Sequence, residues 1–298
     1  MVGLKKFLRA KKGMAVQICP HADVTVRNYE NQVIREVFPE IRGEFKRLGF
    51  KDLGEVGQIK WEYVIDCAGK TEEEVFSSFR KDVRTRIKQA TPRYGVKVRD
   101  LKYDELTIMK EMADEAGAAH QFRDKSLEYY QEMWESFQDK VKFVVAEVPR
   151  EVATGEVERV DDIAGETVDE RSDRSSGKAS RKHSGKLSGE MVPIAAVMYM
   201  LYGTEVISLF SGVTRKYRNV GGCSHLVRWE MIKYAIEQGY PRYNFYGVRP
   251  ETGNSVYKFK EGFRGEIHEL VGTQMLPLTL LGRAATWRAK YYKYGIFG

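Results

Sequence analysis

The feature that most constrains this 298-residue chain is an aromatic segment that ends in glycine and leads into a short basic turn. The segment is residues 242–247 (RYNFYG), and the turn is residues 256–263 (VYKFKEGF). If the turn is extended, its two lysines share one face and its aromatic residues share the other. If the turn is helical, Phe259 and Phe263 meet one turn apart. Either geometry places a cationic group beside aromatic rings, which suits an anionic or nucleotide-bearing ligand.

An ordinary alternative exists for the same residues. The segment can be an aromatic core strand, and the turn can be a solvated lysine-rich loop, because charged turns usually only face water. Local chemistry alone favours this ordinary interpretation.

The net charge of +7 is concentrated in one segment. Residues 80–99 hold eight basic residues and one acid (8 − 1 = +7), so the rest of the chain is neutral overall. A helix that opens with a capping box at Thr71 is predicted to place Arg80, Arg84 and Lys88 on one stripe. Because concentrated positive charge attracts polyanions, the stripe is a candidate site for tRNA or pyrophosphate, and a solvated helix face is the alternative.

The cysteines and the apolar runs indicate a cytoplasmic protein. The three cysteines fit no CxxC pattern, which favours reduced thiols, and no secretory signal or membrane-spanning run is apparent. The five histidines are dispersed without metal-ligand spacing, so no metal site is predicted.

The hydrophobic patterns predict an α/β (α+β) fold with mainly antiparallel mixed sheets. Helices are expected at 1–13, 38–48, 71–90, 104–116, 125–138 and 224–238. Strands are expected at 14–19, 61–67, 142–148, 194–201, 204–211, around Tyr243 and at 267–274. We expect a first domain at 1–95, completed by a C-terminal helix at 276–298, and a second domain at 96–275.

Two segments depart from this pattern. Residues 151–190 contain no aromatic residue and are rich in Gly, Ser, Thr and charge, a composition typical of a flexible insert. Residues 279–298 form a basic aromatic helix. Packing on the first domain is the favoured interpretation of this helix, and peripheral contact with the inner membrane surface is the other.

Two separated blocks, at residues 69–98 and 229–263, resemble the Fem family. These are non-ribosomal peptidyltransferases that build peptidoglycan cross-bridges. The resemblance implies tandem acetyltransferase-like (GNAT-like) domains, of which the first lacks its N-terminal part here. It also implies transfer from aminoacyl-tRNA, as co-substrate without a further cofactor, to the stem-peptide amine of a lipid-linked peptidoglycan precursor.

The resemblance assigns roles within the basic turn. Lys260 matches the family lysine of the transfer site, where an ammonium could stabilise the tetrahedral oxyanion or protonate the leaving ribose hydroxyl. Phe259 and Phe263 match neighbouring aromatic residues that could stack on the terminal adenine. Further candidates for substrate contacts are Lys258, Tyr243 and Tyr246.

Two other functions remain open. A non-catalytic basic paralogue that binds tRNA or precursor is favoured by the incomplete first domain. A coenzyme A-dependent N-acyltransferase is favoured by residues 218–222 (RNVGG), which partly match the pyrophosphate loop of acetyltransferases. Many relatives end the early strand with Asp-Pro, whereas this chain has Cys19-Pro20, so no general base is assigned.

Overall fold

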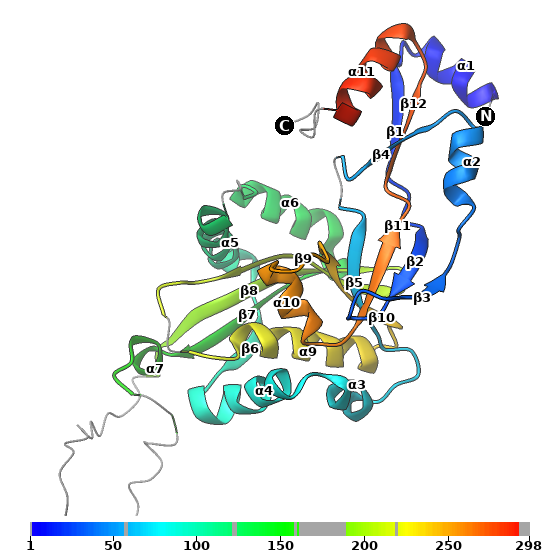
Figure 1. Ribbon diagram of the computed structural model, residues 1–298. Helices are drawn as coiled ribbons and strands as arrows, with labels where there is room; N and C mark the ends of the chain where they lie inside the picture. Colours follow the sequence, from blue (N-terminus) through cyan, green and yellow to red (C-terminus); the bar gives the residue numbers. More distant parts are fainter. Residues whose placement is uncertain are drawn as a thin grey trace, which may run out of the picture. The chain divides into compact units, whose positions relative to one another are not determined.

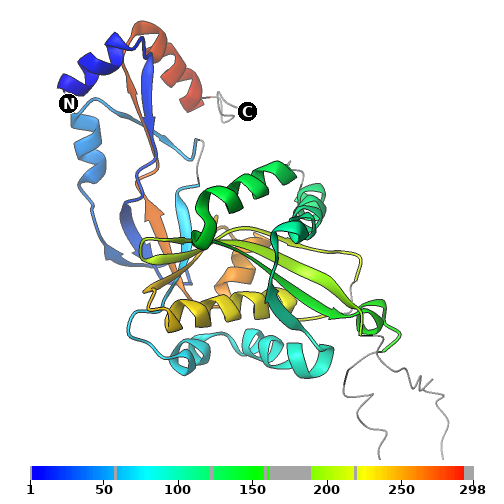
Figure 2. The same cartoon turned by 180° about the vertical axis from the view of Figure 1, so that it is seen from behind.

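The computed structural model describes residues 2–56, 59–120, 124–157, 160, 189–217 and 220–291 (Figures 1 and 2). The chain divides into two compact units. Unit 1 comprises Met1–Asp66 and Asn244–Gly298, and unit 2 comprises Cys67–Tyr243. The expected insert at 151–190 lies mostly outside the described residues. An ion pair between Arg150 and Glu190 connects the two described segments at its ends.

Unit 1 contains a short three-stranded sheet in the order β1-β12-β4. These antiparallel strands are β1 (Ala15–Ile18), β12 (Thr273–Pro277) and β4 (Lys51–Gly54). Three helices accompany them: α1 (Val2–Ala10), α2 (Ile41–Arg47) and α11 (Leu280–Tyr291). Two small cores hold this part together, one around Phe50, Leu276 and Leu278 and one around Leu53, Met275 and Ala289.

The second group of strands in unit 1 has the order β3-β2-β11-β5, followed by the end of β10. The strands are β3 (Val33–Glu36), β2 (Asp23–Arg27), β11 (Glu266–Leu270), β5 (Trp61–Asp66) and β10 (Arg242–Gly247), which begins in unit 2. β2 and β5 both pair antiparallel with β11. The helix α10 (Ser255–Glu261) precedes β11 and is capped by Asn254, whose side chain accepts hydrogen bonds from the backbone N–H groups of Val256 and Tyr257.

A buried carboxylate joins three elements of unit 1. Glu269 on β11 has a side chain that is 8% exposed, and it lies 2.7 Å from Arg42 and 3.1 Å from Lys60. It also accepts a hydrogen bond of 2.8 Å from Thr25 and lies 3.6 Å from Arg27. Burial alone would raise the pKa of Glu269, but the hydrogen bonds from Arg42, Thr25 and Lys60 lower it to about 2.

Unit 2 is built on a four-stranded antiparallel sheet in the order β9-β8-β7-β6. The strands are β9 (Glu205–Val213), β8 (Met191–Tyr202), β7 (Val141–Pro149) and β6 (Lys97–Asp100). β8 is a nearly continuous apolar run, as expected for a central strand that is buried on both faces. The 3₁₀ turns η1 (Tyr103–Glu105) and η2 (Gln138–Lys140) and the short helix α7 (Arg150–Thr154) lie at its connections.

Helices cover both faces of this sheet. On one face, α5 (Leu106–His120) and α6 (Leu127–Phe137) enclose a core that includes Met109, Tyr130 and Phe143. On the other face, α9 (Cys223–Glu237) packs on the sheet and α4 (Lys81–Tyr94) packs on α9. α9 therefore has buried residues around most of its circumference. A short helix, α3 (Glu72–Ser78), precedes α4.

The contact between α4 and α9 explains why the unit boundary differs from the expected limits of 1–95 and 96–275. Residues 67–95 belong to unit 2, since the apolar face of α4 (Val83, Ile87, Ala90) is buried there. The mixed α/β class with antiparallel sheets, in contrast, is confirmed.

Two expected elements are each divided in the structure. The helix expected at 71–90 begins with the expected Thr71 capping box but ends at Ser78, where two serine hydroxyls bond to the preceding turn, and α4 starts at Lys81. The strand expected at 267–274 is two strands of different sheets, β11 and β12. The chain turns between them at Gly272, where φ is +81°.

No helix within the described ranges is both long and apolar enough to cross a membrane.

Candidate functional sites

The lysine of the basic turn lies buried at the end of α10. Lys260 is 7% exposed, and its ammonium donates hydrogen bonds to the carbonyl oxygens of Phe245, Tyr246 and Gly247, at 2.9, 3.2 and 2.6 Å. We call residues 245–247 the carbonyl turn. An ammonium has three N–H donors, so these contacts match its donors in number. Lys260 therefore holds the end of β10 in place, and its positive charge lies beside the carbonyl turn.

The backbone of the carbonyl turn is unusual. Tyr246 has a φ of +61°, which is uncommon for a residue with a side chain. Asn244 stabilises this conformation, because its side-chain oxygen accepts a hydrogen bond of 2.7 Å from the N–H of Tyr246. Strained backbone of this kind persists only where its surroundings hold it, and it is common at functional sites.

A buried acid supports Asn244 in turn. Glu62 on β5 is 3% exposed and accepts a hydrogen bond of 2.8 Å from the Asn244 amide. The same carboxylate oxygen lies 3.0 Å from the imidazole of His21, whose side chain is 53% exposed. Residues from three segments, His21, Glu62 and Asn244, thus form one polar chain that ends at the carbonyl turn.

The aromatic residues of the turn form a cluster beside Lys260. The rings of Phe259 and Phe263 are 5.5 Å apart, and that of Phe263 is 4.9 Å from the ring of Phe245. The helical interpretation of the turn is therefore confirmed, and the extended one is wrong. Because the turn is helical, Lys258 is exposed while Lys260 is buried.

The other residues predicted to contact the substrate differ in how far their side chains are exposed. Phe259 and Tyr246 are half-buried, so a ligand could reach them. Phe263 is fully buried within the aromatic cluster. Tyr243, in unit 2, is also fully buried, with its ring 6.1 Å from that of Tyr199, and burial raises its pKa well above the ordinary value. In this structure Tyr243 and Phe263 are core residues, each within its own unit.

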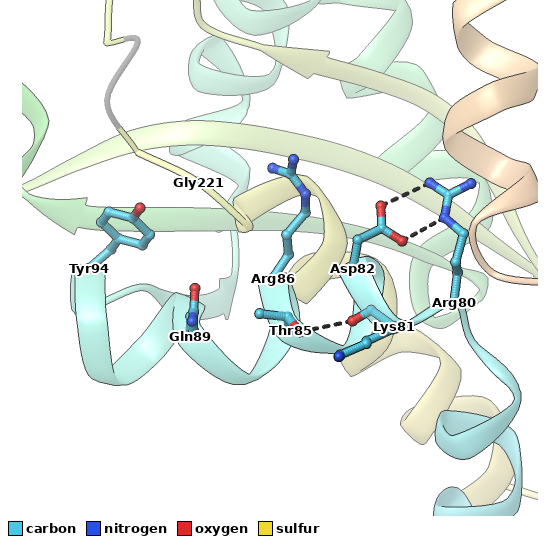
Figure 3. Close-up of a pocket in the computed structure, with 8 residues that line it drawn as sticks. All are labelled: Arg80, Lys81, Asp82, Thr85, Arg86, Gln89, Tyr94 and Gly221. Atoms are coloured by element: carbon cyan, nitrogen blue, oxygen red, sulfur yellow. Dashed lines mark hydrogen bonds and ion pairs between the residues drawn. The ribbon is translucent and has the colours of Figure 1, made fainter.

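Unit 2 contains a separate basic cavity of about 660 Å³ along α4 (Figure 3). Eight residues line it: Arg80, Lys81, Asp82, Thr85, Arg86, Gln89, Tyr94 and Gly221. Three are cations and one is an acid, so the lining carries a charge of 3 − 1 = +2. The paired Arg80 and Asp82 lie at one end of the cavity, and the ring of Tyr94 lies at the other.

The acid in the cavity is already paired. Arg80 donates two hydrogen bonds to Asp82, at 2.5 and 2.9 Å, and they lower the pKa of Asp82 to about 2. Asp82 therefore stays ionised near neutral pH and holds Arg80 in one orientation. Lys81 and Arg86, both exposed, are the cations best placed to meet an anionic ligand.

The predicted basic stripe is only partly correct as a description of this surface. Arg80 is the residue that precedes α4, with an extended ψ of 143°, so it does not continue a helical stripe with Arg84 and Lys88. Neither Arg84 nor Lys88 lines the cavity, and the Lys88 ammonium lies over the ring of Phe76 at 5.6 Å. The sequence pattern missed Arg86, because the glycine loop at Gly221 and Gly222, distant in sequence, decides which face of α4 lines the cavity.

The glycine loop lies against the same helix. Gly222 has a φ of +86°, and a Cβ atom there would lie 2.6 Å from the carbonyl oxygen of Arg86. Gly221 lines the cavity, and a Cβ atom there would lie 3.5 Å from the Tyr94 ring. Glycine is thus required at position 222 to bring the start of α9 close to α4. Residues 218–219 of the expected pyrophosphate loop lie outside the described residues.

The sequence matches the family model described as the FemAB family, over residues 1–188 and 166–285. It is 24% identical over 311 aligned residues to the aminoacyltransferase FemA of Staphylococcus epidermidis, covering 92% of this chain and 74% of that protein. It is 25% identical over 332 aligned residues to FemA of Staphylococcus aureus, covering 99% of this chain and 78% of that protein.

The fold agrees with these matches. A crystal structure of FemX superposes with a TM-score of 0.70 at 16% identity, over 97% of this chain and 77% of that one. The chain belongs to the FemAB family, and the expected resemblance is confirmed. It is accordingly an acyltransferase enzyme, of the aminoacyltransferase type that its relatives are named for.

Proposed function

We propose that this enzyme transfers an amino acid from aminoacyl-tRNA to the stem-peptide amine of a lipid-linked peptidoglycan precursor, and so forms interpeptide bridges. The match to the FemAB family along nearly the whole chain is the observation that carries this proposal. The reaction takes place on the cytoplasmic side of the membrane, where charged tRNA is available.

The reaction is the aminolysis of an ester. The amine nitrogen attacks the ester carbonyl carbon, a tetrahedral oxyanion forms, and the bond to the ribose oxygen breaks. An amide bond replaces the ester bond, and the proton lost by the amine ends on the ribose hydroxyl. Catalysis requires alignment of the two substrates and stabilisation of the oxyanion.

Lys260 is the residue that we assign to this chemistry. Its buried ammonium places a fixed positive charge beside the carbonyl turn, where a developing oxyanion would be stabilised. Direct donation to the oxyanion would require one of the three carbonyl contacts to open. Phe259, half-buried beside it, is a surface on which the terminal adenine could stack.

The basic cavity in unit 2 supports the tRNA part of the proposal. Its volume of about 660 Å³ and its charge of +2 suit a short stretch of phosphodiester backbone. The exposed Lys81 and Arg86 would contact phosphates, and the Tyr94 ring offers a face for a base.

Replacing both Lys81 and Arg86 by alanine is expected to weaken tRNA binding. The affinity falls with salt, and each lost phosphate contact reduces the magnitude of the slope of log affinity against log salt by roughly 0.9. The double variant should therefore reduce that magnitude by about 2. The measurement is the affinity for one purified tRNA over a series of salt concentrations.

The matched control replaces both Arg84 and Lys88 by alanine. This double variant loses the same charge from the same helix, but at positions that do not line the cavity. This control is expected to change the slope by less than half as much. If the control pair has the larger effect, the helix stripe binds the tRNA and the cavity does not.

A coenzyme A-dependent N-acyltransferase is the second candidate, and the glycine loop favours it. Gly221 borders the cavity at the start of α9, where a diphosphate could meet backbone N–H groups. Donor competition separates the two functions: the purified enzyme is incubated with precursor and either labelled aminoacyl-tRNA or labelled acetyl-coenzyme A. We expect label only from aminoacyl-tRNA, and label only from the thioester would replace our proposal with the second candidate.

A further inference from the structure

The helices α1 and α11 lie near each other at one end of unit 1 (Figures 1 and 2). Backbone hydrogen bonds connect the segments next to these helices: the N–H groups of Leu278 and Thr279 both donate to the carbonyl of Met14, at 2.9 and 3.2 Å. The residues that follow α1 and those that precede α11 are therefore fixed against each other.

α11 has two different faces. Its packed face consists of small residues: Gly282, Thr286, which is 5% exposed, and Ala289, which is 1% exposed. A Cβ atom on Gly282 would lie only 1.9 Å from the carbonyl oxygen of Met14, so this face fits closely against unit 1. The packing interpretation of the final helix therefore accounts for only one of its faces.

The opposite face of α11 is apolar and exposed. Leu280 is 80% exposed, Leu281 is 70% exposed and Trp287 is 60% exposed. In the adjoining segments, Phe7 on α1 is 58% exposed, and Met14, which accepts the hydrogen bonds from Leu278 and Thr279, is 53% exposed. Single exposed apolar residues are common on soluble proteins, but several large ones gathered at one end indicate an interaction surface. We call these five residues the apolar end.

The two segments that carry the apolar end, residues 2–14 and 278–291, have charges of one sign. Residues 2–14 include five basic residues and no acid, and residues 278–291 include three basic residues and no acid. Among them, Lys6, Lys11, Lys12, Arg283 and Lys290 are exposed. Basic amphipathic helices that expose Leu, Phe and Trp lie in the interface of anionic bilayers, where the apolar side chains insert and the basic ones contact head groups.

We propose that the apolar end docks unit 1 on the surface of an anionic lipid bilayer. Two copies of the chain that met through this surface would bring like charges together, which disfavours self-association. A nucleic acid would satisfy the basic residues but would leave Leu280 and Leu281 exposed to water. An anionic bilayer satisfies both kinds of residue. The inference does not depend on the transfer reaction, because lipid binding is measured without substrates.

The test is co-sedimentation of the full chain with vesicles. We expect binding to vesicles of phosphatidylglycerol and phosphatidylcholine, and at least tenfold weaker binding to phosphatidylcholine alone. Leu280→Glu with Leu281→Glu is expected to lower the affinity for anionic vesicles by about tenfold or more. Arg283→Glu with Lys290→Glu should also lower it and should reduce its dependence on salt.

The matched control is Tyr202→Glu, which changes a side chain that is 72% exposed, in unit 2. It should bind vesicles as the unchanged protein does, and circular dichroism should show that all variants are folded. Binding that is equal on neutral and anionic vesicles, or unaffected by Leu280→Glu with Leu281→Glu, would overturn the proposal. It would also be overturned if light scattering showed a dimer that this double variant dissociates while vesicles remain unbound. A second copy would then cover the apolar end.

Discussion

Replacing Lys260 by alanine is expected to lower the rate of aminoacyl transfer by about 100-fold or more, as the loss of one oxyanion-stabilising group typically does. The change also leaves three carbonyl oxygens without the buried ammonium that they contact in the structure. The second effect should lower the free energy of unfolding by about 2 kcal/mol. The measurements are kcat and KM for transfer, together with denaturant unfolding.

Two further substitutions separate chemistry from structure at this position. Lys260→Met keeps most of the side-chain volume and removes the charge, whereas Lys260→Arg keeps the charge with a different donor geometry. If the charge acts on the oxyanion, Lys260→Met lowers kcat while KM changes little. If Lys260 acts only by holding the carbonyl turn, both variants raise KM, and unfolding free energy falls in parallel with activity.

The control for these variants is Lys46→Ala, which removes an exposed lysine from α2 in the same unit. It should leave kcat and KM unchanged within about twofold. A loss below about threefold for Lys260→Ala would remove Lys260 from the mechanism.

Replacing Glu269 by glutamine is expected to lower the free energy of unfolding by about 3 kcal/mol. The amide keeps the volume of the side chain but leaves Arg27, Arg42 and Lys60 together without their shared counter-charge. Because these three cations are partly exposed, the loss should lie at the lower end of the range for a broken buried ion pair. Urea unfolding at neutral pH measures it.

The same carboxylate makes stability depend on pH. Its pKa in the folded protein is about 2, below the ordinary value of 4.5, so its contribution is complete above pH 4.5 and is lost as the pH falls towards 2. After allowance for solvent screening at the exposed cations, the loss should amount to about 2 kcal/mol. The Glu269→Gln variant should show a correspondingly flatter profile below pH 4.5.

The control is Glu44→Gln, which changes an acid that is 49% exposed and pairs with Arg47 on α2. It should alter the free energy of unfolding by less than about 1 kcal/mol. Equal effects of Glu44→Gln and Glu269→Gln would mean that burial of the Glu269 network contributes no additional stability.

Much of the fold follows from local patterns in the sequence. The apolar run of β8, the capping box at Thr71 and the helical spacing of Phe259 and Phe263 each act over a few neighbouring residues. For this reason, the α/β class and most helices could be predicted. The division of 267–274 into β11 and β12 could not, because pairing with different strands decides it and not the local pattern.

The candidate sites show the same distinction. Lys260 was found by resemblance to a family motif, but its three carbonyl partners depend on the positive φ of Tyr246. Glu62 and His21 lie far from that motif in sequence, so only the fold brings them to Asn244. A polar Asn between the aromatic residues of β10 was a further local sign that this strand has a special role.

The most direct test of our account is mass spectrometry of lipid-linked precursor after incubation with the purified enzyme and a pool of charged tRNAs. We predict a product heavier by one aminoacyl residue, formed only when the tRNA is charged and greatly reduced by Lys260→Met. The mass increase would also identify the amino acid. An unchanged precursor, with tRNA binding intact, would contradict the proposed transfer and would support a non-catalytic binding protein.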